Sequence, residues 1–527
     1  MMKKAIKKLL AALLAVAMVC AMAIPAFAGT EGDITTWHSF SAFQIFTGNV
    51  EGNVSNDFKI SNVAWGSNIA DDAAAFLDQL KSADTIGPLF ANAHSAQDVL
   101  EVISQWKDSD ANSIAFARFV CHYLYPNANA NPTPAVTGGS DALTFNEAGY
   151  YLIVDTTPFN PGDFDHAYNS FLLKVTKANW REPITPKAEK PSVKKEVFDN
   201  QDGTSTGDFG SSADHAINEK FQFKLTATLP ASTDHAYDYY DTYAVCFNDT
   251  LSAGITFDNL DTVEIANVDG SDSKEITDYT LVKDLHEAGL PSSIKLSIDN
   301  VKTAGLDLND GATITVTYTA HLNDKAYVNT GSGSTENKNS VQLQYSNNPR
   351  PGEYWGTTPK SEVYVFTYQL NNTKRQNTVD GPALAGAGFK LYSDAECNNE
   401  VGLYQEGEFY YPIKDATGKK AVEMISGENG QFNVKGLDAG TYYLKETITP
   451  AGYDTCGVTP VTIKADHSGN DHVNLEGSNL TIVNKKAGGI TLPSTGGIGT
   501  TLFYVVGGGL MVAAIVLLVT KKRMENK

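Results

Sequence analysis

The stretch Tyr442-Tyr-Leu-Lys-Glu-Thr-Ile-Thr-Pro-Ala-Gly-Tyr453 decides the fold of the C-terminal part of the chain. Side chains of a strand point alternately to opposite faces, so Tyr442, Leu444 and Glu446 share one face. Glu446 then points inward among apolar neighbours, where burial favours the neutral form of a carboxyl group. The stretch predicts a strand that carries an acid into a hydrophobic core.

Two further alternating stretches bring an amine and a carboxamide to apolar faces of the same region. The alternating positions at its two ends are Phe366, Tyr368, Leu370, Asn372 and Lys374, and Leu480, Ile482 and Asn484. A neutral amine, a carboxamide and a neutral acid on facing strands are the ingredients of an isopeptide bond: the amine attacks the carboxamide carbon, the acid polarises its oxygen, and ammonia leaves. Residues from about 361 to 487 are therefore interpreted as one β-unit, the third of the chain.

The region from about 191 to 360 repeats this arrangement and forms a second unit. Short strands punctuated by Gly, Asn and Asp, with little helix, predict an all-β sandwich. The expected strands include Lys220–Leu229, Tyr239–Phe247, Ile294–Ile298, Ala312–His321 and Val341–Tyr345. Lys195 shares an apolar face with Val193 and Val197, and Asn339 shares one with Val341. Burial lowers the pKa of a lysine. For one such pair, two polar groups with ordinary hydrogen-bond partners are the simpler alternative.

The first unit, residues 29–185, is expected to be a β-domain with a helical insertion. Ser41–Phe46 and Gly149–Val154 are rich in aromatic and branched residues, as strands are. Between them, Asp71–Leu80 and Ala96–Trp106 place apolar residues at helical spacing. The histidines of this unit fall in unrelated contexts, so the sequence predicts neither a metal site nor a cofactor; they are His38, His94 and His122.

Both ends of the chain carry targeting signals. Four lysines before residue 9 precede the apolar stretch Leu9–Met22, and Ala26-Phe-Ala28 predicts cleavage by signal peptidase between Ala28 and Gly29. Near the other end, Ile498–Thr520 contains no charged residue and exceeds the roughly 20 residues that a helix needs to cross a bilayer. The basic residues that follow are typical of a cytoplasmic stop.

Composition indicates an exported globular protein. The formal net charge of −21 argues against a nucleic-acid partner. Of the five cysteines, Cys20 leaves with the signal peptide, and the others are widely spaced without a CxxC pair. Pairing of Cys397 with Cys456 is left open.

The C-terminal pentapeptide, the apolar span and the basic tail together resemble the cell-wall sorting signal of Gram-positive surface proteins. The residues that carry the motif are Leu492, Pro493, Thr495 and Gly496. The resemblance implies that sortase cleaves between Thr495 and Gly496 and transfers Thr495 to an amine nucleophile. The alternative is an ordinary membrane anchor.

The third unit resembles a collagen-adhesin B-type pilin domain through Leu384–Tyr392, Val483–Lys486 and the Tyr442–Tyr453 stretch, which matches the pilin E-box. The resemblance implies a Lys374–Asn484 isopeptide bond promoted by Glu446.

The second unit resembles the A-type companion domain through Tyr240–Ile255 and Asn339–Tyr345. This implies a Lys195–Asn339 bond promoted by Asp249, with Lys194 and Asp241 as alternatives. In the first unit, Ile34–Phe46 contains no lysine, so we expect no bond of this kind there.

The linker Trp180–Pro191 resembles the pilin motif of shaft pilins, whose lysine accepts the next subunit. Pro186-Lys187 is the matching pair, so Lys187 is the expected intersubunit lysine and Lys190 the alternative. On composition alone, the stretch is better interpreted as a solvated hinge between domains.

The chain as a whole resembles a sortase-assembled backbone pilin of Gram-positive bacteria. The expected fold is mainly β, with tandem immunoglobulin-like sandwiches. The expected divisions are 1–28 signal peptide, 29–185, 186–360 and 361–487 β-domains, and 488–527 sorting signal with a span at 498–520.

The resemblance implies a non-enzymatic, wall-anchored fimbrial subunit whose precursor passes through the plasma membrane. Its implied partners are sortases of the pilin and housekeeping types, identical subunits, minor pilins and peptidoglycan. The alternative function is a monomeric wall-anchored adhesin or a pilus tip protein, for which the sequence identifies no host ligand.

Overall fold

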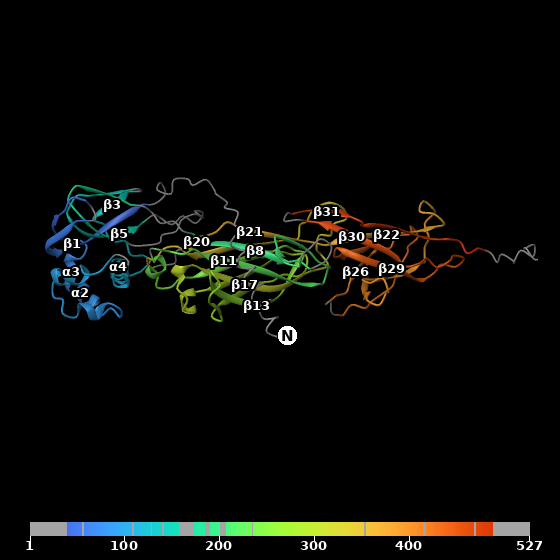
Figure 1. Ribbon diagram of the computed structural model, residues 1–527, viewed down its shortest axis with the longest axis horizontal. Helices are drawn as coiled ribbons and strands as arrows, with labels where there is room; N and C mark the ends of the chain where they lie inside the picture. The colour runs from blue at the N-terminus through green and yellow to red at the C-terminus, as the bar shows by residue number, and fades with distance from the viewer. Residues whose placement is uncertain are drawn as a thin grey trace, which may run out of the picture.

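The computed structural model describes residues 39–488, except for gaps at 55–56, 108–109, 128, 140–141, 157–171, 185–189, 201–206, 234, 352–354, 415–417 and 468–470. Three units lie in a row along the long axis of the molecule, with the first unit at one end and the third at the other (Figure 1). The prediction of tandem, mainly-β sandwich units is confirmed. Within 39–488, apart from those gaps, no helix is long and apolar enough to cross a membrane.

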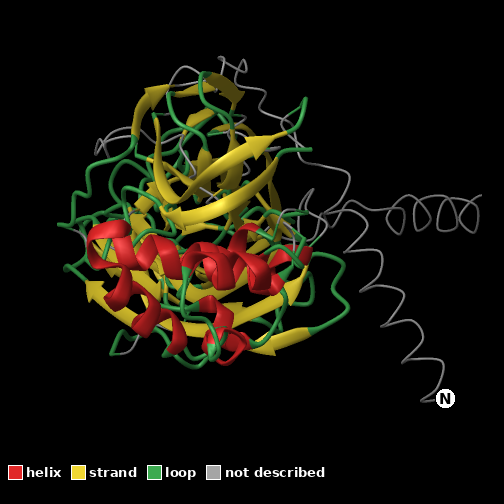
Figure 2. Ribbon diagram, turned by 90° about the vertical axis from the view of Figure 1, so that its left-hand side faces the viewer, coloured by secondary structure: helices red, strands yellow, loops and turns green. Residues whose placement is uncertain are grey.

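The first unit combines a sheet of order β2-β1-β5-β6, with β3 paired to β1, and a β4–β7 ribbon. Figure 2 looks along the long axis from this end and shows the helices gathered on one side of the strands. Helix α3 begins at a capping box, in which Ser95 and Asp98 satisfy each other's backbone N–H groups. The elements are β1 (Phe40–Glu51), β2 (Lys59–Trp65), η2 (Ala70–Asp72), α2 (Ala73–Lys81), η3 (Gly87–Phe90), α3 (Ala96–Ile103), α4 (Ala111–Leu124), β3 (Val136–Gly139), β4 (Ala142–Phe145), β5 (Gly149–Asp155), β6 (Leu172–Thr176) and β7 (Trp180–Pro183).

The second unit is a sandwich of two sheets, ordered β10-β21-β19-β12-β16-β15 and β14-β13-β17-β11-β8-β9, with β20 paired to β19. Its strands alternate buried and less buried residues, as in β17, because one face of each sheet covers the shared core. The elements are β8 (Ser192–Phe198), β9 (Phe209–Gly210), β10 (Ser212–Asp214), β11 (Lys220–Leu229), η4 (Ala236–Tyr239), β12 (Val245–Leu251), β13 (Ile255–Asn267), β14 (Ser273–Glu275), β15 (Thr280–Asp284), β16 (Ser292–Ile298), η5 (Val301–Ala304), η6 (Leu308–Asp310), β17 (Ala312–Leu322), β18 (Gly333–Ser334), β19 (Lys338–Ser346), β20 (Trp355–Thr357) and β21 (Ser361–Phe366).

The third unit is a smaller sandwich, with sheets ordered β31-β30-β29-β23-β24 and β25-β26-β28-β22-β32. Its first and last strands, β22 and β32, pair in parallel. The elements are β22 (Tyr368–Gln376), β23 (Gly388–Tyr392), β24 (Glu400–Val401), β25 (Leu403–Glu406), β26 (Phe409–Pro412), β27 (Met424–Ile425), β28 (Val434–Leu437), β29 (Gly440–Ile448), β30 (Thr459–Asp466), β31 (His472–Glu476) and β32 (Asn479–Asn484).

Three boundaries differ from the sequence-based expectation. The segment expected as a strand from Tyr239 begins instead with the turn η4, and β12 starts only at Val245. The expected division at 360/361 falls before β21, which pairs with β19 and so completes the sheet of the second unit. Trp180–Pro183, expected at the start of the linker, pairs with β4 and belongs to the first unit.

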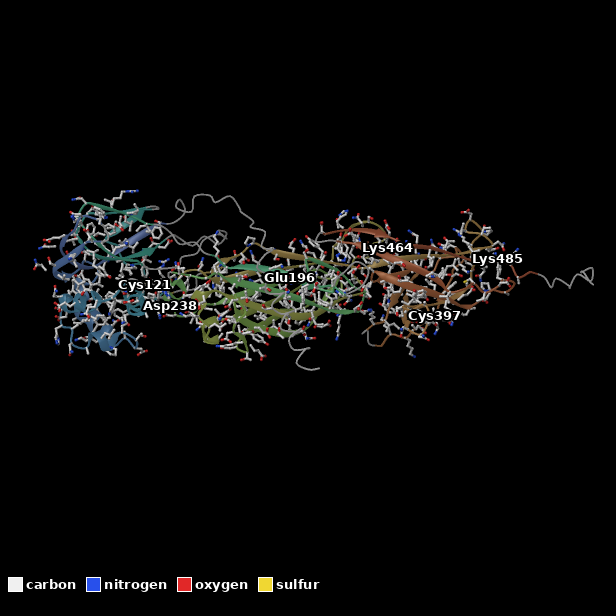
Figure 3. The ribbon with its side chains drawn as sticks, in the orientation of Figure 1. Cys121, Glu196, Asp238, Cys397, Lys464 and Lys485 are labelled. Atoms are coloured by element: carbon white, nitrogen blue, oxygen red, sulfur yellow. The ribbon has the colours of Figure 1, made fainter. Side chains whose placement is uncertain are left out.

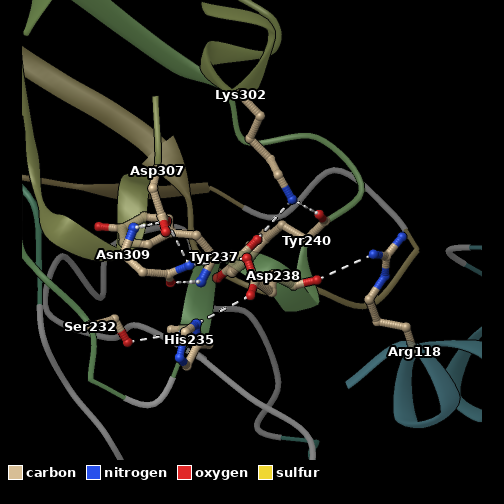
Figure 4. Close-up of polar contacts among 10 residues, drawn as sticks. Arg118, Ser232, His235, Tyr237, Asp238, Tyr240, Lys302, Asp307 and Asn309 are labelled. Carbon is tan, nitrogen blue, oxygen red and sulfur yellow. Dashed lines mark hydrogen bonds and ion pairs between the residues drawn. The ribbon is translucent and has the colours of Figure 1, made fainter. Parts of the chain in front are cut away.

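The first and second units meet where α4 contacts η4. Arg118 on α4 donates to the backbone oxygen of Asp238 at 3.2 Å, and Figure 4 shows its side chain reaching across to that turn. Lys302 ties the same turn to its own unit by donating to the backbone oxygens of Tyr237 and Tyr240. Tyr239 extends into the core of the first unit. Cys121 and Asp238 mark the two sides of this junction in Figure 3.

The second and third units share backbone hydrogen bonds. Strand β18 of the second unit pairs with β31 of the third, and Ile217 N–H donates to the Gly436 oxygen at 2.9 Å. Gly436 has a φ of +81°, and an added Cβ would lie 2.5 Å from the Ile217 side chain. Glycine is required there by both conformation and space.

Candidate functional site

The third unit brings together the three groups expected from its sequence. Lys374 on β22 and Asn484 on β32 are same-face neighbours, because the parallel register pairs Lys374 with Ile482 and Gln376 with Asn484. Glu446 reaches them from β29 of the facing sheet. All three residues are buried, and the Lys374 and Glu446 side chains have no exposed surface.

Distances within this cluster place the amine against the carboxamide. Lys374 Nζ lies 2.5 Å from Asn484 Oδ1 and 3.9 Å from Glu446 Oε1. Asn484 Nδ2 lies 2.6 Å from Glu446 Oε1, and Cys456 N–H donates to Glu446 Oε2 at 2.7 Å. Burial lowers the pKa of Lys374 although the neighbouring Cys456 and Glu446 act in the opposite direction. The amine is therefore biased toward its neutral, nucleophilic form.

The orientation of the Asn484 carboxamide decides which atom the acid activates. Nitrogen and oxygen of a carboxamide exchange places on a 180° rotation about the terminal bond. In the rotated arrangement Asn484 Oδ1 would face Glu446, and a proton donated to it there would withdraw electrons from the carboxamide carbon. Rotation about this one bond therefore exchanges the group that faces Lys374 with the group that faces Glu446.

A comparable cluster lies in the core of the second unit. Lys195 comes from β8 in one sheet, and Asp249 on β12 and Asn339 on β19 come from the other. Because Asp249 is paired with Val341 and Leu251 with Asn339, the acid and the carboxamide are diagonal neighbours on one face. These three residues are at most 2% exposed.

Tyr318 on β17 links this second cluster. Its hydroxyl lies 3.1 Å from Lys195 Nζ, 2.8 Å from Asp249 Oδ2 and 2.5 Å from Asn339 Nδ2. Lys195 Nζ lies 2.5 Å from Asp249 Oδ2. Sequence reasoning missed Tyr318, although its inward position in the alternating stretch of residues 312–321 was visible.

Burial lowers the pKa of Lys195 to about 8, against the opposing attraction of Asp249. Asp249 Oδ1 and Asn339 Oδ1 are buried without a hydrogen-bond partner. A protonated Asp249 would supply a donor that the carboxylate lacks. Transfer of one proton from Lys195 to Asp249 makes a neutral amine and a neutral acid together, without changing the net charge of the core.

The alternatives considered for the second unit lie elsewhere. Lys194 pairs with Glu196 and its side chain is 62% exposed. Asp241 is 54% exposed and faces Arg118 and His122 at the junction with the first unit. Neither meets Asn339 in the core.

Burial also separates the two candidate lysines from the rest. Within the part of the chain that the structure describes, Lys195 and Lys374 are the buried lysines. Strand β1 of the first unit carries none. The expected absence of a bond in that unit stays a prediction.

Several predicted positions lie outside the described residues. They are Lys187, Ala28, Gly29, Leu492, Pro493, Thr495 and Gly496. Lys190, the alternative intersubunit lysine, is described and exposed. The cysteines in the described part of the chain are unpaired thiols, including Cys397 and Cys456.

Comparison with known proteins identifies two segments directly. Residues 370–485 match the family model of the prealbumin-like fold domain SpaA, and residues 484–526 match the LPXTG cell wall anchor motif. The anchor implies sortase processing and linkage to peptidoglycan. The protein is therefore anchored to the cell wall and displayed at the surface.

Two curated proteins match parts of the chain. The trypsin-resistant surface T6 protein of Streptococcus pyogenes is 26% identical over 326 residues, which cover 57% of this chain and 52% of that protein. The serine-aspartate repeat-containing protein C of Staphylococcus aureus is 29% identical over 209 residues, 38% of this chain and 19% of that protein. The chain thus spans about half the length of the first relative and a fifth of the second.

Solved structures of pilins also align with the chain. The T6 backbone pilin of serotype M6 Streptococcus pyogenes covers 86% of this chain and 96% of its own, with 15% identity and a TM-score of 0.45. A C-terminal fragment of the major pilin GBS80 of Streptococcus agalactiae covers 56% and 99%, with 20% identity and a TM-score of 0.40. The anchor motif, the SpaA domain and the T6 sequence match support the resemblance found in the sequence: this wall-anchored chain is similar to the sortase-assembled backbone pilins.

Proposed function

We propose that the chain is the repeating shaft subunit of a covalent cell-surface pilus, and that each of its last two units is closed by an internal Lys–Asn isopeptide bond. The observation that carries the proposal is the buried cluster of Lys374, Asn484 and Glu446, which spans the first and last strands of a wall-anchored unit. A covalent tie at this place resists separation of the strands better than backbone hydrogen bonds alone.

The bond in the third unit forms by transamidation. The neutral Lys374 Nζ attacks the side-chain carbonyl carbon of Asn484 while protonated Glu446 donates to the carboxamide oxygen. The tetrahedral intermediate collapses as the proton on its oxygen moves to the amide nitrogen, which leaves as ammonia, and Glu446 recovers a proton from the attacking nitrogen. Lys195, Asn339 and Asp249 follow the same course in the second unit, and Tyr318 holds the amine, the acid and the carboxamide in one hydrogen-bonded group.

Assembly of the shaft uses sortase rather than chemistry of this chain. The sortase cysteine attacks the Thr495 carbonyl, the Thr495–Gly496 bond breaks, and the resulting thioester is resolved by an amine of another subunit. Lys187 is the proposed amine, because Pro186-Lys187 matches the Pro-Lys pair of the pilin motif. In this scheme the chain is a substrate of pilin and housekeeping sortases and joins minor pilins and peptidoglycan at the ends of the polymer.

Detergent-boiled wall extracts test this function. The wild-type chain should give a ladder of covalent oligomers, and Lys187→Ala should reduce the ladder to monomer. Lys190→Ala is the matched control in the same linker and should leave the ladder intact. A wild-type chain found only as a monomer would instead support a singly anchored adhesin, and a ladder that survives both substitutions would overturn the linker assignment.

A further inference from the structure

A cluster of one imidazole and two carboxylates lies at the junction of the second and third units. Asp199 follows β8 and Asp214 ends β10, both in the second unit, whereas His467 follows β30 in the third. One potential ligand atom from each residue lies within 4.8 Å of the other two. Figure 3 labels Lys464 on β30, which lies near the end of the third unit that faces the second and so marks the region of the cluster.

The imidazole is held so that Nε2 faces the carboxylates. The Ser212 hydroxyl donates to the His467 backbone oxygen at 2.8 Å, so it accepts a hydrogen bond from His467 Nδ1 at 2.9 Å. With Nδ1 bound to Ser212, a neutral His467 directs the lone pair of Nε2 toward the two acids, whereas the protonated form presents an N–H group to them. Burial lowers the pKa of His467, but hydrogen bonding and attraction to Asp214 and attraction to Asp199 raise it above its usual value. A lone pair facing two carboxylates is unfavourable, so either Nε2 carries a proton or a cation lies between the three groups.

The distances fit shared coordination better than direct hydrogen bonds. His467 Nε2 lies 3.6 Å from Asp214 Oδ1 and 3.7 Å from Asp199 Oδ2. These separations exceed the roughly 2.7–3.2 Å of an N–H···O hydrogen bond. Ligand atoms about 2.1 Å from a tetrahedral zinc ion lie roughly 3.4 Å apart, close to the separations seen.

Two buried polar atoms beside the cluster make no hydrogen bond of ordinary length. Asp214 is 2% exposed, yet its second carboxylate oxygen accepts no hydrogen bond. The hydroxyl of fully buried Tyr368 also makes no hydrogen bond of ordinary length, and burial together with the neighbouring Asp214 raises the pKa of this hydroxyl. Such groups are costly to bury without a partner. A bound cation could be coordinated by the second carboxylate oxygen of Asp214.

The adjacent cluster of His215, Glu219 and Asp438 provides a contrast. His215 Nε2 donates to the Phe198 oxygen at 2.7 Å, and its Nδ1 faces the Asn200 amide at 3.2 Å. Both ring nitrogens are therefore occupied by protein groups. His467 differs because Nε2 faces only the two carboxylates at distances beyond a hydrogen bond.

We propose that Asp199, Asp214 and His467 form a binding site for one divalent transition-metal ion, of the zinc class, that ties the third unit to the second. Imidazole favours zinc and its neighbours over calcium and magnesium, which prefer oxygen ligands alone. Three protein ligands leave a fourth position for water. The site is separate from the isopeptide clusters, so the proposal does not depend on the proposed function.

A zinc titration tests the site. The full chain is kept in detergent, stripped of metal with a chelator and then titrated with zinc chloride. We expect about one high-affinity zinc ion per chain and a higher Tm of the zinc-loaded protein. His467→Ala and the isosteric Asp214→Asn should weaken binding by more than the roughly 10- to 100-fold that loss of an outer-shell partner costs. His472→Ala should leave binding unchanged, because this nearby histidine is exposed and lies outside the cluster.

Cobalt(II) supplies a second readout that does not depend on stability. The cobalt-loaded wild-type chain should show visible absorption of a tetrahedral site, and Asp214→Asn should alter that spectrum. Failure of the wild-type chain to bind zinc would overturn the proposal and leave His467 as an imidazolium between two carboxylates. Calcium binding with the same dependence on His467, or zinc binding unaffected by Asp214→Asn and His467→Ala, would overturn it as well.

Discussion

At the scale of single residues, the number of protons held by Lys195 and Asp249 decides whether the second unit can crosslink. Lys195 and Asp249 form a buried pair with one proton to share. The reactive state, with a neutral amine and a protonated acid, holds the same number of protons as the ion pair. Its population is therefore independent of pH as long as the pair keeps that proton.

The number of protons on this pair predicts how bond formation in the second unit depends on pH. The pKa of Lys195 is lowered to about 8, so the pair loses its shared proton as pH rises through that value. The rate should be constant just below pH 8 and fall about tenfold for each further pH unit. Mass spectrometry of a chain made in vitro, purified in denaturant and then refolded would follow the rate. A rate that instead rises through pH 8 would show that the free amine limits the reaction and that Asp249 is not the acid.

At the scale of elements, alternation in the sequence predicted the site better than it predicted its boundaries. The inward positions of Lys374, Glu446 and Asn484 follow from a period of two, because each lies in a strand with one buried face. Strand β21 could not be assigned to the second unit, since its pairing with β19 and β10 is set by contacts distant in sequence.

Other parts of the site depend on tertiary contacts that no local pattern reveals. Tyr318 was visible as an inward tyrosine, but its three polar partners come from three other strands. The facing of His467 toward Asp214 requires the third unit to dock on the second. Helix α4 also went unpredicted, because the apolar residues Ala115, Phe119 and Tyr123 lie on the side opposite its buried residues and weaken the contrast between its faces.

The close approach of β28 to the second unit gives an element-scale prediction. Gly436→Ala places a Cβ 2.5 Å from Ile217 at a φ of +81°. Gly386 has a similar φ of +77° with nothing within 4 Å, so Gly386→Ala is a matched control for conformational strain alone. Overpacking should make Gly436→Ala less stable than the control by about 1–3 kcal/mol in unfolding by urea. Equal destabilisation by the two substitutions would mean that the residues at the junction shift to make room for the added methyl group without loss of stability.

At the scale of the whole molecule, the proposed attachment points determine which units carry tension. With neighbouring subunits joined at Lys187 and Thr495, tension passes through the second and third units and bypasses the first. Lys485, next to Asn484, lies at the far end of the third unit in Figure 3, so the Lys374–Asn484 tie shortens the path through that unit. The absence of a predicted crosslink in the first unit fits this path.

The position of Asn339 predicts that the proposed bond protects only part of the second unit from unfolding under tension. After the Lys195–Asn339 tie, residues 340–366 remain in the path, including β21. Pulling a single chain by handles at position 187 and the C-terminus should release at most about 90 Å from this segment, at roughly 3.4 Å per residue, and nothing from the third unit's core. Asn339→Ala should lengthen the release to the full second unit. Full extension of the wild-type second unit would contradict a tie at Asn339.

The intact mass of the mature chain tests the central claim, that the last two units are closed by Lys–Asn bonds, most directly. Closure of both units lowers the mass below the calculated value by two molecules of ammonia, one for each bond. Asp249→Asn and Glu446→Gln should each restore one ammonia, after allowance for the substitution, because each removes the acid of one cluster. A wild-type chain with the full unmodified mass would contradict the account.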